Sequence, residues 1–126
     1  MISVLLMIFT GICNACMDVL RVRWKTSIFR FWKNQNWINP ALSWHNKWKN
    51  GDQTQREKFF GSSTFFVWLT DFWHFCKFLM LIFITSAIIF YNPMFKWWID
   101  FIILYCAFTI TFEIFFSKIL ISSKNI

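Results

Sequence analysis

Charged side chains are scarce in this chain. Asp, Glu, Lys and Arg make up only 15% of its 126 residues, whereas 57% of the residues are hydrophobic and 23% are aromatic. Soluble domains carry about 25% charged residues. The composition therefore excludes an ordinary water-soluble domain, and the length corresponds to one domain. We predict a single membrane domain over residues 1–126.

The short motifs that mark common catalytic sites are also missing. The sequence has no P-loop, no HExxH, no GxSxG and no serine placed beside a histidine along the chain. It has no internal repeat and no low-complexity tract either. Small three-span enzymes exist, so these absences leave the question of catalysis open.

Cysteine is absent from the polar parts of the chain. All four cysteines lie in apolar runs, at Cys13, Cys16, Cys76 and Cys106. Because a disulfide framework would place cysteines in loops, none is predicted. Cys13 and Cys16 form a CxxC, which in a soluble protein indicates redox or metal chemistry. Inside an apolar run we interpret them as small side chains of a membrane helix.

Three apolar runs are long enough to cross a bilayer, which takes about 20 residues. They cover residues 2–20, 65–90 and 98–121. The first has no basic residues before it, and Asn14 and Asp18 occupy the place of a cleavage site, which favours a retained helix over a signal peptide. Gly11 and Ala15 predict a close approach by a neighbouring helix. The expected fold is an all-α membrane protein with three transmembrane helices.

The segment between the first two runs, residues 21–64, is strongly basic and rich in tryptophan. Its excess of Lys and Arg over Asp and Glu predicts a cytoplasmic loop, with the N-terminus outside and the C-terminus inside a bacterial inner membrane. Tryptophan beside basic residues is typical of a segment at the headgroup level. We therefore expect anionic lipid headgroups, not nucleic acid, as the partner of a chain with net charge +7. The predicted interface residues are Trp24, Trp32, Trp37, Trp44 and Trp48 in the loop, with Trp97 and Trp98 at the opposite surface.

Ionisable residues recur at one depth of the three predicted spans. With a rise of about 1.5 Å per residue, Asp18, Asp71 with His74, and Glu113 all fall near the cytoplasmic side. Charged groups inside a membrane are costly and by default mark a functional site. The alternative is that they only pair with nearby cations and hold the helices together. Asn14 is expected to support the layer, and Lys77 to neutralise Asp71.

Three functions fit this polar layer. The first is a divalent metal or acid–base site, with Asp18, Asp71, His74 and Glu113 as metal ligands and the last three as catalytic candidates. Such a site would act on a phosphorylated lipid headgroup held at the N-terminus of the second helix. The residues expected to hold that phosphate are Arg56, Lys58, Ser62, Ser63 and Thr64.

The other two functions involve no reaction. A proton or ion pathway would need polar groups across the whole membrane, and the outer halves of the spans offer few, so we rank it lower. The third function is an accessory or assembly subunit, or a phage-type membrane modulator, whose polar layer docks partner helices. A homo-oligomer is expected in that case, because three helices barely enclose a polar centre.

Four segments resemble a group of uncharacterised small multi-pass membrane proteins of Bacteroidetes and their phages. They are GICNACMD at residues 11–18, NPALSWHNKWKNGD at 39–52, EKFFGSST at 57–64 and TDFWH at 70–74. No activity is known for that group, so the resemblance implies no catalytic role. It does imply that the loop and the acidic positions belong to one unit.

Overall fold

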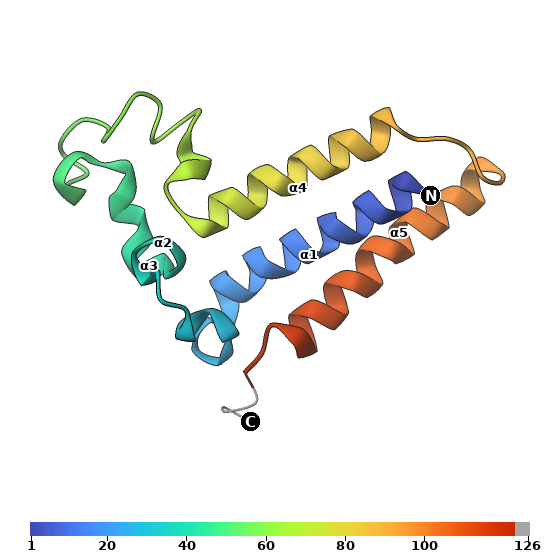
Figure 1. Cartoon of the computed structure of the whole chain (residues 1–126), viewed down its shortest axis with the longest axis horizontal. Coiled ribbons are helices and arrows are strands. Elements are labelled where there is room, and N and C mark those ends of the chain that lie inside the picture. Colours follow the sequence, from blue (N-terminus) through green and yellow to red (C-terminus); the bar gives the residue numbers. More distant parts are fainter. Residues whose placement is uncertain (123–126) are drawn as a thin grey trace.

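The computed structural model describes residues 1–122 and consists of three long helices joined by a folded loop (Figure 1). The long helices are α1 (Ile2–Val22), α4 (Phe72–Ile89) and α5 (Trp97–Ile114), and a π-helix over Phe115–Ile119 prolongs α5. Each is long and apolar enough to cross a membrane. The part of the chain described contains no strand, only two isolated β-bridges. The predicted all-α, three-span fold is confirmed.

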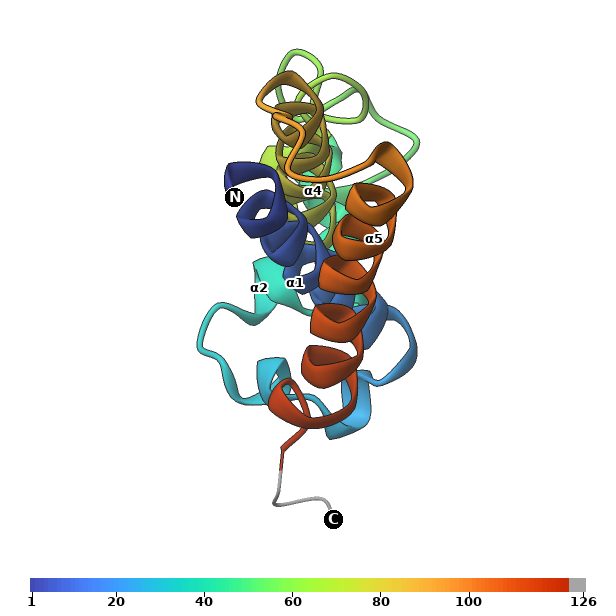
Figure 2. The same ribbon diagram turned by 90° about the vertical axis from the view of Figure 1, so that its right-hand side faces the viewer.

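Helix α1 is the central helix. It packs against both α4 and α5, which barely touch each other. Figure 2 shows α4 and α5 apart, with α1 running beside both. Buried residues accordingly make up 44% of the α1 span but only 11% and 6% of the spans in α4 and α5. The outer two helices therefore present most of their surface to the bilayer.

The closest contact between α1 and α5 occurs at Gly11. A Cβ atom built on Gly11 would lie 2.7 Å from the backbone oxygen of Phe108 and 3.1 Å from Cβ of Thr111. Only a residue without a side chain allows the two backbones to come this near. Ala15, one turn further along, is fully buried. The close approach predicted from Gly11 and Ala15 is thus confirmed.

The second long helix begins at Phe72 instead of Phe65, which corrects the predicted boundary. Asp71 has an extended backbone, and its carboxylate accepts a hydrogen bond from the backbone N–H of His74 at 2.8 Å. This is an N-cap, and it starts the helix there. The apolar residues before it form turns and a short 3-10 helix over Val67–Leu69.

The loop between α1 and α4 folds into a chain of short helical turns at one end of the bundle. This end, where α1 and α5 finish and α4 begins, is called the loop end below. Hydrogen bonds tie the start of the loop to the end of the chain: the N–H of Ile28 donates to the oxygen of Leu120, and that of Ser122 to the oxygen of Thr26. The short elements are 3-10 helices over Trp24–Thr26, Ile28–Phe31, Trp44–Lys47 and Lys49–Gly51, with α2 (Gln35–Ile38) and α3 (Pro40–Ser43) between them.

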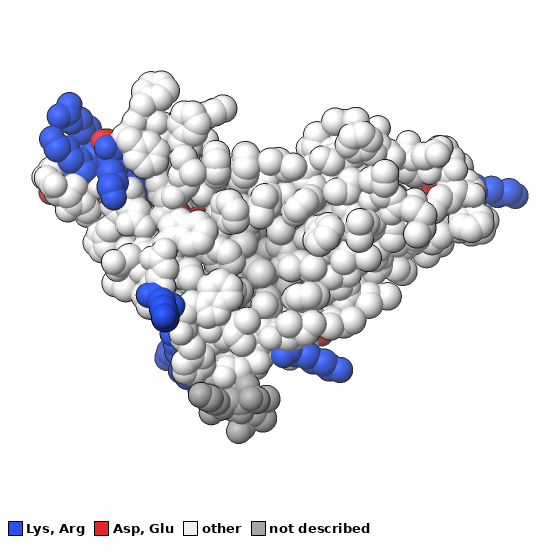
Figure 3. Space-filling model, in the orientation of Figure 1, with Lys and Arg blue, Asp and Glu red and all other residues white. Residues whose placement is uncertain are grey.

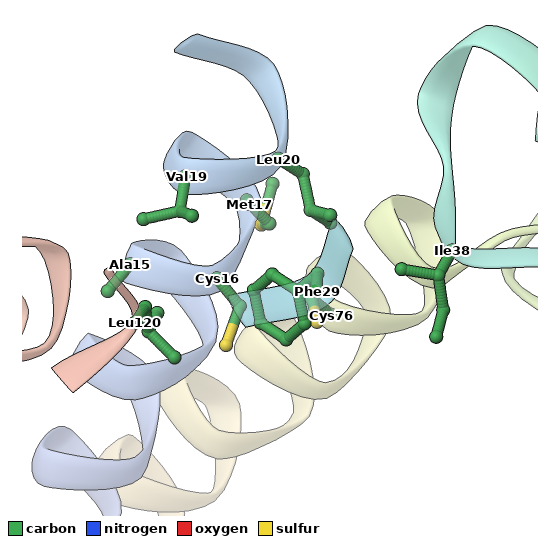
Figure 4. Close-up of a cluster of buried hydrophobic side chains, with 9 residues drawn as sticks. All are labelled: Ala15, Cys16, Met17, Val19, Leu20, Phe29, Ile38, Cys76 and Leu120. Carbon is green, nitrogen blue, oxygen red and sulfur yellow. The ribbon is translucent and has the colours of Figure 1, made fainter. Parts of the chain in front are cut away.

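The apolar core also lies at the loop end. Phe29 from the loop is 1% exposed and packs among side chains of α1, α4 and the C-terminal segment (Figure 4). The members of this cluster are Ala15, Cys16, Met17, Val19, Leu20, Phe29, Ile38, Cys76 and Leu120. Packing of the loop against the helices makes the two one structural unit.

Lys and Arg side chains gather mainly at the loop end (Figure 3). Along the long helices the face shown is almost without charge. An uncharged flank with a basic end is the charge distribution expected of a membrane protein whose basic end meets lipid headgroups.

Candidate functional site

A small pocket opens where the loop covers the start of α4. It has a volume of about 170 Å³. Helix α3 and the turn after it form one wall, and the first turn of α4 forms the other. The lining residues are Ile38, Pro40, Ser43, Trp44, Lys47, Asp71, Trp73 and His74. The pocket thus combines a carboxylate, an imidazole, an ammonium and a hydroxyl group at the point where a membrane span begins.

Asp71 and His74 form a tightly bonded pair inside this pocket. Nδ1 of His74 lies 2.7 Å and 2.9 Å from the two carboxylate oxygens of Asp71. Their spacing of three residues at the first turn of α4 places both side chains on one face. Asp71 therefore has two roles, as N-cap of the helix and as partner of the imidazole.

The pKa of Asp71 lies below its ordinary value. Burial alone would raise this pKa, but the hydrogen bonds from the ring and backbone of His74 outweigh it, with help from the positive charges of His74 and Lys47. The carboxylate is therefore ionised at neutral pH. It fixes the proton of His74 on Nδ1, since a carboxylate can only accept a hydrogen bond.

Hydrogen bonds from the loop hold the pocket walls together. The side-chain amide of Asn46 donates to the backbone oxygens of Thr70 and Asn36, each at 2.8 Å. Nε1 of Trp37 donates to the oxygen of Leu69 at 3.3 Å. The loop is thereby fixed to the residues just before α4, and Lys47 is fixed relative to Asp71.

The predicted metal site is not assembled. Within residues 1–122, no three His, Cys, Asp or Glu side chains come together in a way that could hold a metal ion. Asp71 and His74 meet, but Glu113 is exposed on α5 and accepts a hydrogen bond from Ser117 at 2.5 Å. Asp18 and Asn14 are half-buried on α1. Equal depth did not bring these groups together, because depth says nothing about which way each helix face points.

Lys77 is not the counter-charge of Asp71. Its ammonium lies 5.5 Å from the ring centre of Trp73, an arrangement typical of a cation–π contact. The described ion pair of Asp71 is with His74. His74 is three residues away and on the same face, whereas Lys77 is exposed.

The predicted phosphate site is occupied by the protein's own carboxylate. Glu57 accepts hydrogen bonds from the N–H groups of Gly61 and Ser63 and from the hydroxyl of Ser63. The hydroxyl of Ser63, the N–H of Gly61 and the N–H of Ser63 together hold the pKa of Glu57 below its ordinary value.

The other residues of the predicted phosphate site have different places. Ser62 is buried and donates to the backbone oxygen of Lys47 at 2.6 Å. Thr64, Arg56 and Lys58 are exposed, and the segment precedes α4 by several residues. No helix N-terminus is therefore available there for a phosphate.

Several of the predicted interface tryptophans also pack against the protein. Trp32 and Trp37 contact the ring of Phe72 at the start of α4, with ring centres 6.0 Å and 5.4 Å apart. Trp24 packs against the apolar core, and the ring of Trp44 contacts that of His45 at a tilt of 33°. Trp48 is half-buried and lies in the bridge to Glu57. At the other end, Trp97 and Trp98 are exposed, 78% and 49% respectively.

Lys47 and Ser43 are site residues that the sequence pattern did not single out. Ser43 is the last residue of α3, which Asn39 caps by accepting from the N–H of Ala41, and Lys47 ends the 3-10 helix that follows. Lys47 is one of many basic residues in the loop, so its position did not mark it as a site residue. Ser43 lies far from His74 along the chain, so the sequence did not show that the two residues line one pocket. Their one sequence signal was the Asn-Pro turn, which favours a helix start and a reversal of the chain toward α4.

A larger groove lies at the opposite end of the bundle. It has a volume of about 490 Å³ and is lined almost wholly by apolar residues of α4 and α5, with Met7 of α1. Asp100 at its edge is fully bonded: it accepts from the hydroxyl of Tyr91 and from the N–H groups of Met94 and Phe95. Asp100 thus organises the connection between α4 and α5, and the groove itself offers little chemistry.

Comparison with known proteins gives no relative: no family model matches the chain, and no curated protein or solved structure is detectably similar to it.

Proposed function

We propose that the protein is an integral inner-membrane protein that binds the phosphate group of an anionic phospholipid in the pocket of Lys47, Asp71 and His74. The observation that carries this proposal is the pocket itself, which joins the ammonium group of Lys47 to the bonded pair of Asp71 and His74 where a membrane span begins. Lys47 supplies the positive charge for the phosphate.

The surroundings of the pocket favour a lipid over a soluble anion. Trp44 is 42% exposed at its rim, and Phe60 and Phe65 of the same loop are 89% and 77% exposed. Large exposed aromatic side chains beside basic residues are typical of a surface that lies at the boundary between headgroups and hydrocarbon. We place this boundary on the cytoplasmic side, because the loop carries most of the Lys and Arg residues.

Replacing Lys47 by glutamine is expected to weaken binding of phosphatidylglycerol about 10- to 100-fold, since a charge-assisted hydrogen bond contributes about 1.5–3 kcal/mol. Binding of dioctanoyl phosphatidylglycerol to the purified full chain can be followed by native mass spectrometry. The matched control is Lys49→Gln, which removes an exposed lysine that does not line the pocket. Equal affinities for the two variants, or equal binding of phosphatidylcholine, would contradict the proposal.

Assembly with a second copy of the chain is the other candidate function. Glu113 favours it, because this carboxylate is exposed on a spanning helix, where contact with lipid is costly. Cys106 and Thr109 are exposed as well and share its helix face through their spacing. A second copy of α5 packed on this face would remove Glu113 from lipid.

Oxidative crosslinking tests this assembly. Cys106 is exposed, whereas Cys13, Cys16 and Cys76 are buried. Treatment of native membranes with copper phenanthroline is expected to give a disulfide-linked dimer of the wild type and of Cys13→Ser, and none of Cys106→Ser. A chain that stays monomeric under these conditions would count against self-association through α5.

A further inference from the structure

The hydroxyl of Ser43 differs in its hydrogen bonding from those of three other buried serines. Ser3, Ser27 and Ser62 each donate a hydrogen bond to a backbone oxygen. The hydroxyl of Ser43 makes no hydrogen bond with any residue from 1 to 122, although this residue is only 5% exposed. The hydroxyl is therefore free to bond to water or to a ligand.

Ser43 lines the same pocket as Asp71 and His74. Every polar side-chain atom that is wholly shut off from solvent in residues 1–122 has a hydrogen-bond partner. Oγ of Ser43 has none and therefore keeps some accessible surface, and the cavity that Ser43 lines is the one with Asp71 and His74. Ser43, Asp71 and His74 therefore border one cavity, and the hydroxyl of Ser43 is neither bonded within the described chain nor wholly shut off from solvent.

His74 is oriented by Asp71 as a general base would be. Its Nδ1 is bonded to the ionised Asp71, so the neutral ring carries its lone pair on Nε2. Nε2 forms no hydrogen bond with another described residue. A nucleophile, a base and a carboxylate that orients the base are the parts of a serine acyl-transfer site, which is recognised by these roles and not by the order of residues in the chain.

We infer that Ser43, His74 and Asp71 form an acyl-transfer site that cleaves the carboxylic ester of a phospholipid, an inference that rests on the lipid binding proposed above. The pocket lies where α4 enters the membrane, and the acyl esters of a phospholipid lie at this same boundary between headgroup and hydrocarbon. Phosphate held at Lys47 would bring the ester toward Ser43.

The reaction takes place in two steps. Oγ of Ser43 attacks the ester carbonyl carbon while Nε2 of His74 takes the hydroxyl proton; the carbon–oxygen bond to the glycerol then breaks, and the leaving alkoxide takes that proton from His74. In the second step water attacks the acyl-serine, with His74 again as base. The bond between Oγ and the acyl carbon breaks, and Ser43 regains its proton.

A fluorophosphonate–biotin probe, which reacts with activated serine hydroxyls, tests the inference on the full chain in lipid nanodiscs. The tryptic peptide of residues 34–47 contains Ser43 and no other hydroxyl-bearing residue. We expect the wild type to carry the adduct on this peptide. An unlabelled wild type, or an adduct on another peptide, would overturn the inference. The experiment uses only the wild-type protein, so its outcome does not depend on whether a variant folds.

Variants then assign the roles. Ser43→Ala should abolish labelling, His74→Gln should slow it about 100-fold or more, and Ser63→Ala, which alters a serine bonded to Glu57, should leave the rate unchanged. Equal labelling of His74→Gln and the wild type would remove His74 as the base. If Ser43 is labelled but the protein binds phosphatidylglycerol no better than phosphatidylcholine, the proposed lipid binding alone is refuted. If the protein prefers phosphatidylglycerol but Ser43 is not labelled, the acyl transfer alone is refuted.

Discussion

Replacement of Gly11 by leucine is expected to lower the free energy of unfolding by about 3 kcal/mol. The reason is the contact between α1 and α5, where even a Cβ atom would lie 2.7 Å from the backbone oxygen of Phe108. A backbone atom cannot rotate away as a side chain can, so α5 must move as a whole. Titration of the purified protein with a denaturing detergent, followed by far-UV circular dichroism, gives the change in stability.

Graded variants separate crowding from other effects at this position. Gly11→Ala should destabilise less than leucine, because alanine favours a helix by about 1 kcal/mol relative to glycine and so offsets part of the crowding. Val22→Leu adds one methylene group to an exposed residue of the same helix and should have no effect. If Gly11→Leu were as stable as the wild type, the close packing of α1 on α5 would be refuted.

The second large effect is expected at Asp71, where alanine and asparagine should differ. Asp71→Ala removes the N-cap of α4 and should cost about 1–2 kcal/mol. Asparagine caps helices about as well as aspartate, so Asp71→Asn should retain most of this stability. It nevertheless removes the negative charge that holds the His74 ring and should abolish reaction at Ser43. Equal loss of stability in both variants would show that the charge, and not the cap, carries the structural role.

The same carboxylate predicts a dependence of stability on pH. Because the pKa of Asp71 is lower in the folded protein than in an unfolded chain, the folded state binds the proton less tightly. The stabilisation is complete above the ordinary pKa of an aspartate and is lost as the pH falls through the lowered value. In Asp71→Asn this part of the acid dependence should be absent.

Hydropathy was enough to predict the three spans but not where the second one starts. Phe65 to Leu69 is as apolar as the helix that follows, so nothing in its composition separates the two. The boundary depends on Asp71, whose carboxylate caps the helix. From the sequence, Asp71 was interpreted as a site residue or as a partner of nearby cations, and not as a helix cap. A single acidic residue inside an apolar stretch can therefore mark a helix start as well as a site.

The site was predictable only in part, because its residues come together through contacts distant in sequence. The spacing of Asp71 and His74 showed that they share a helix face. Lys47 and Ser43 reach them through the fold of the loop, which depends on bonds such as those from Asn46 to Thr70 and Asn36. Glu57 fills the predicted phosphate site through local contacts instead, since its carboxylate accepts from the N–H groups of Gly61 and Ser63 in the turn that follows it.

Accessibility of engineered cysteines tests most directly the central claim, a three-span protein whose pocket faces the cytoplasm. Gln53 in the loop and Asn92 in the connection between α4 and α5 are both exposed and lie at opposite ends of the bundle. In a Cys106→Ser background, Gln53→Cys should be protected from a membrane-impermeant maleimide in intact bacterial cells and react after permeabilisation, while Asn92→Cys should react in intact cells. Reaction of Gln53→Cys in intact cells, with Asn92→Cys protected, would contradict the account.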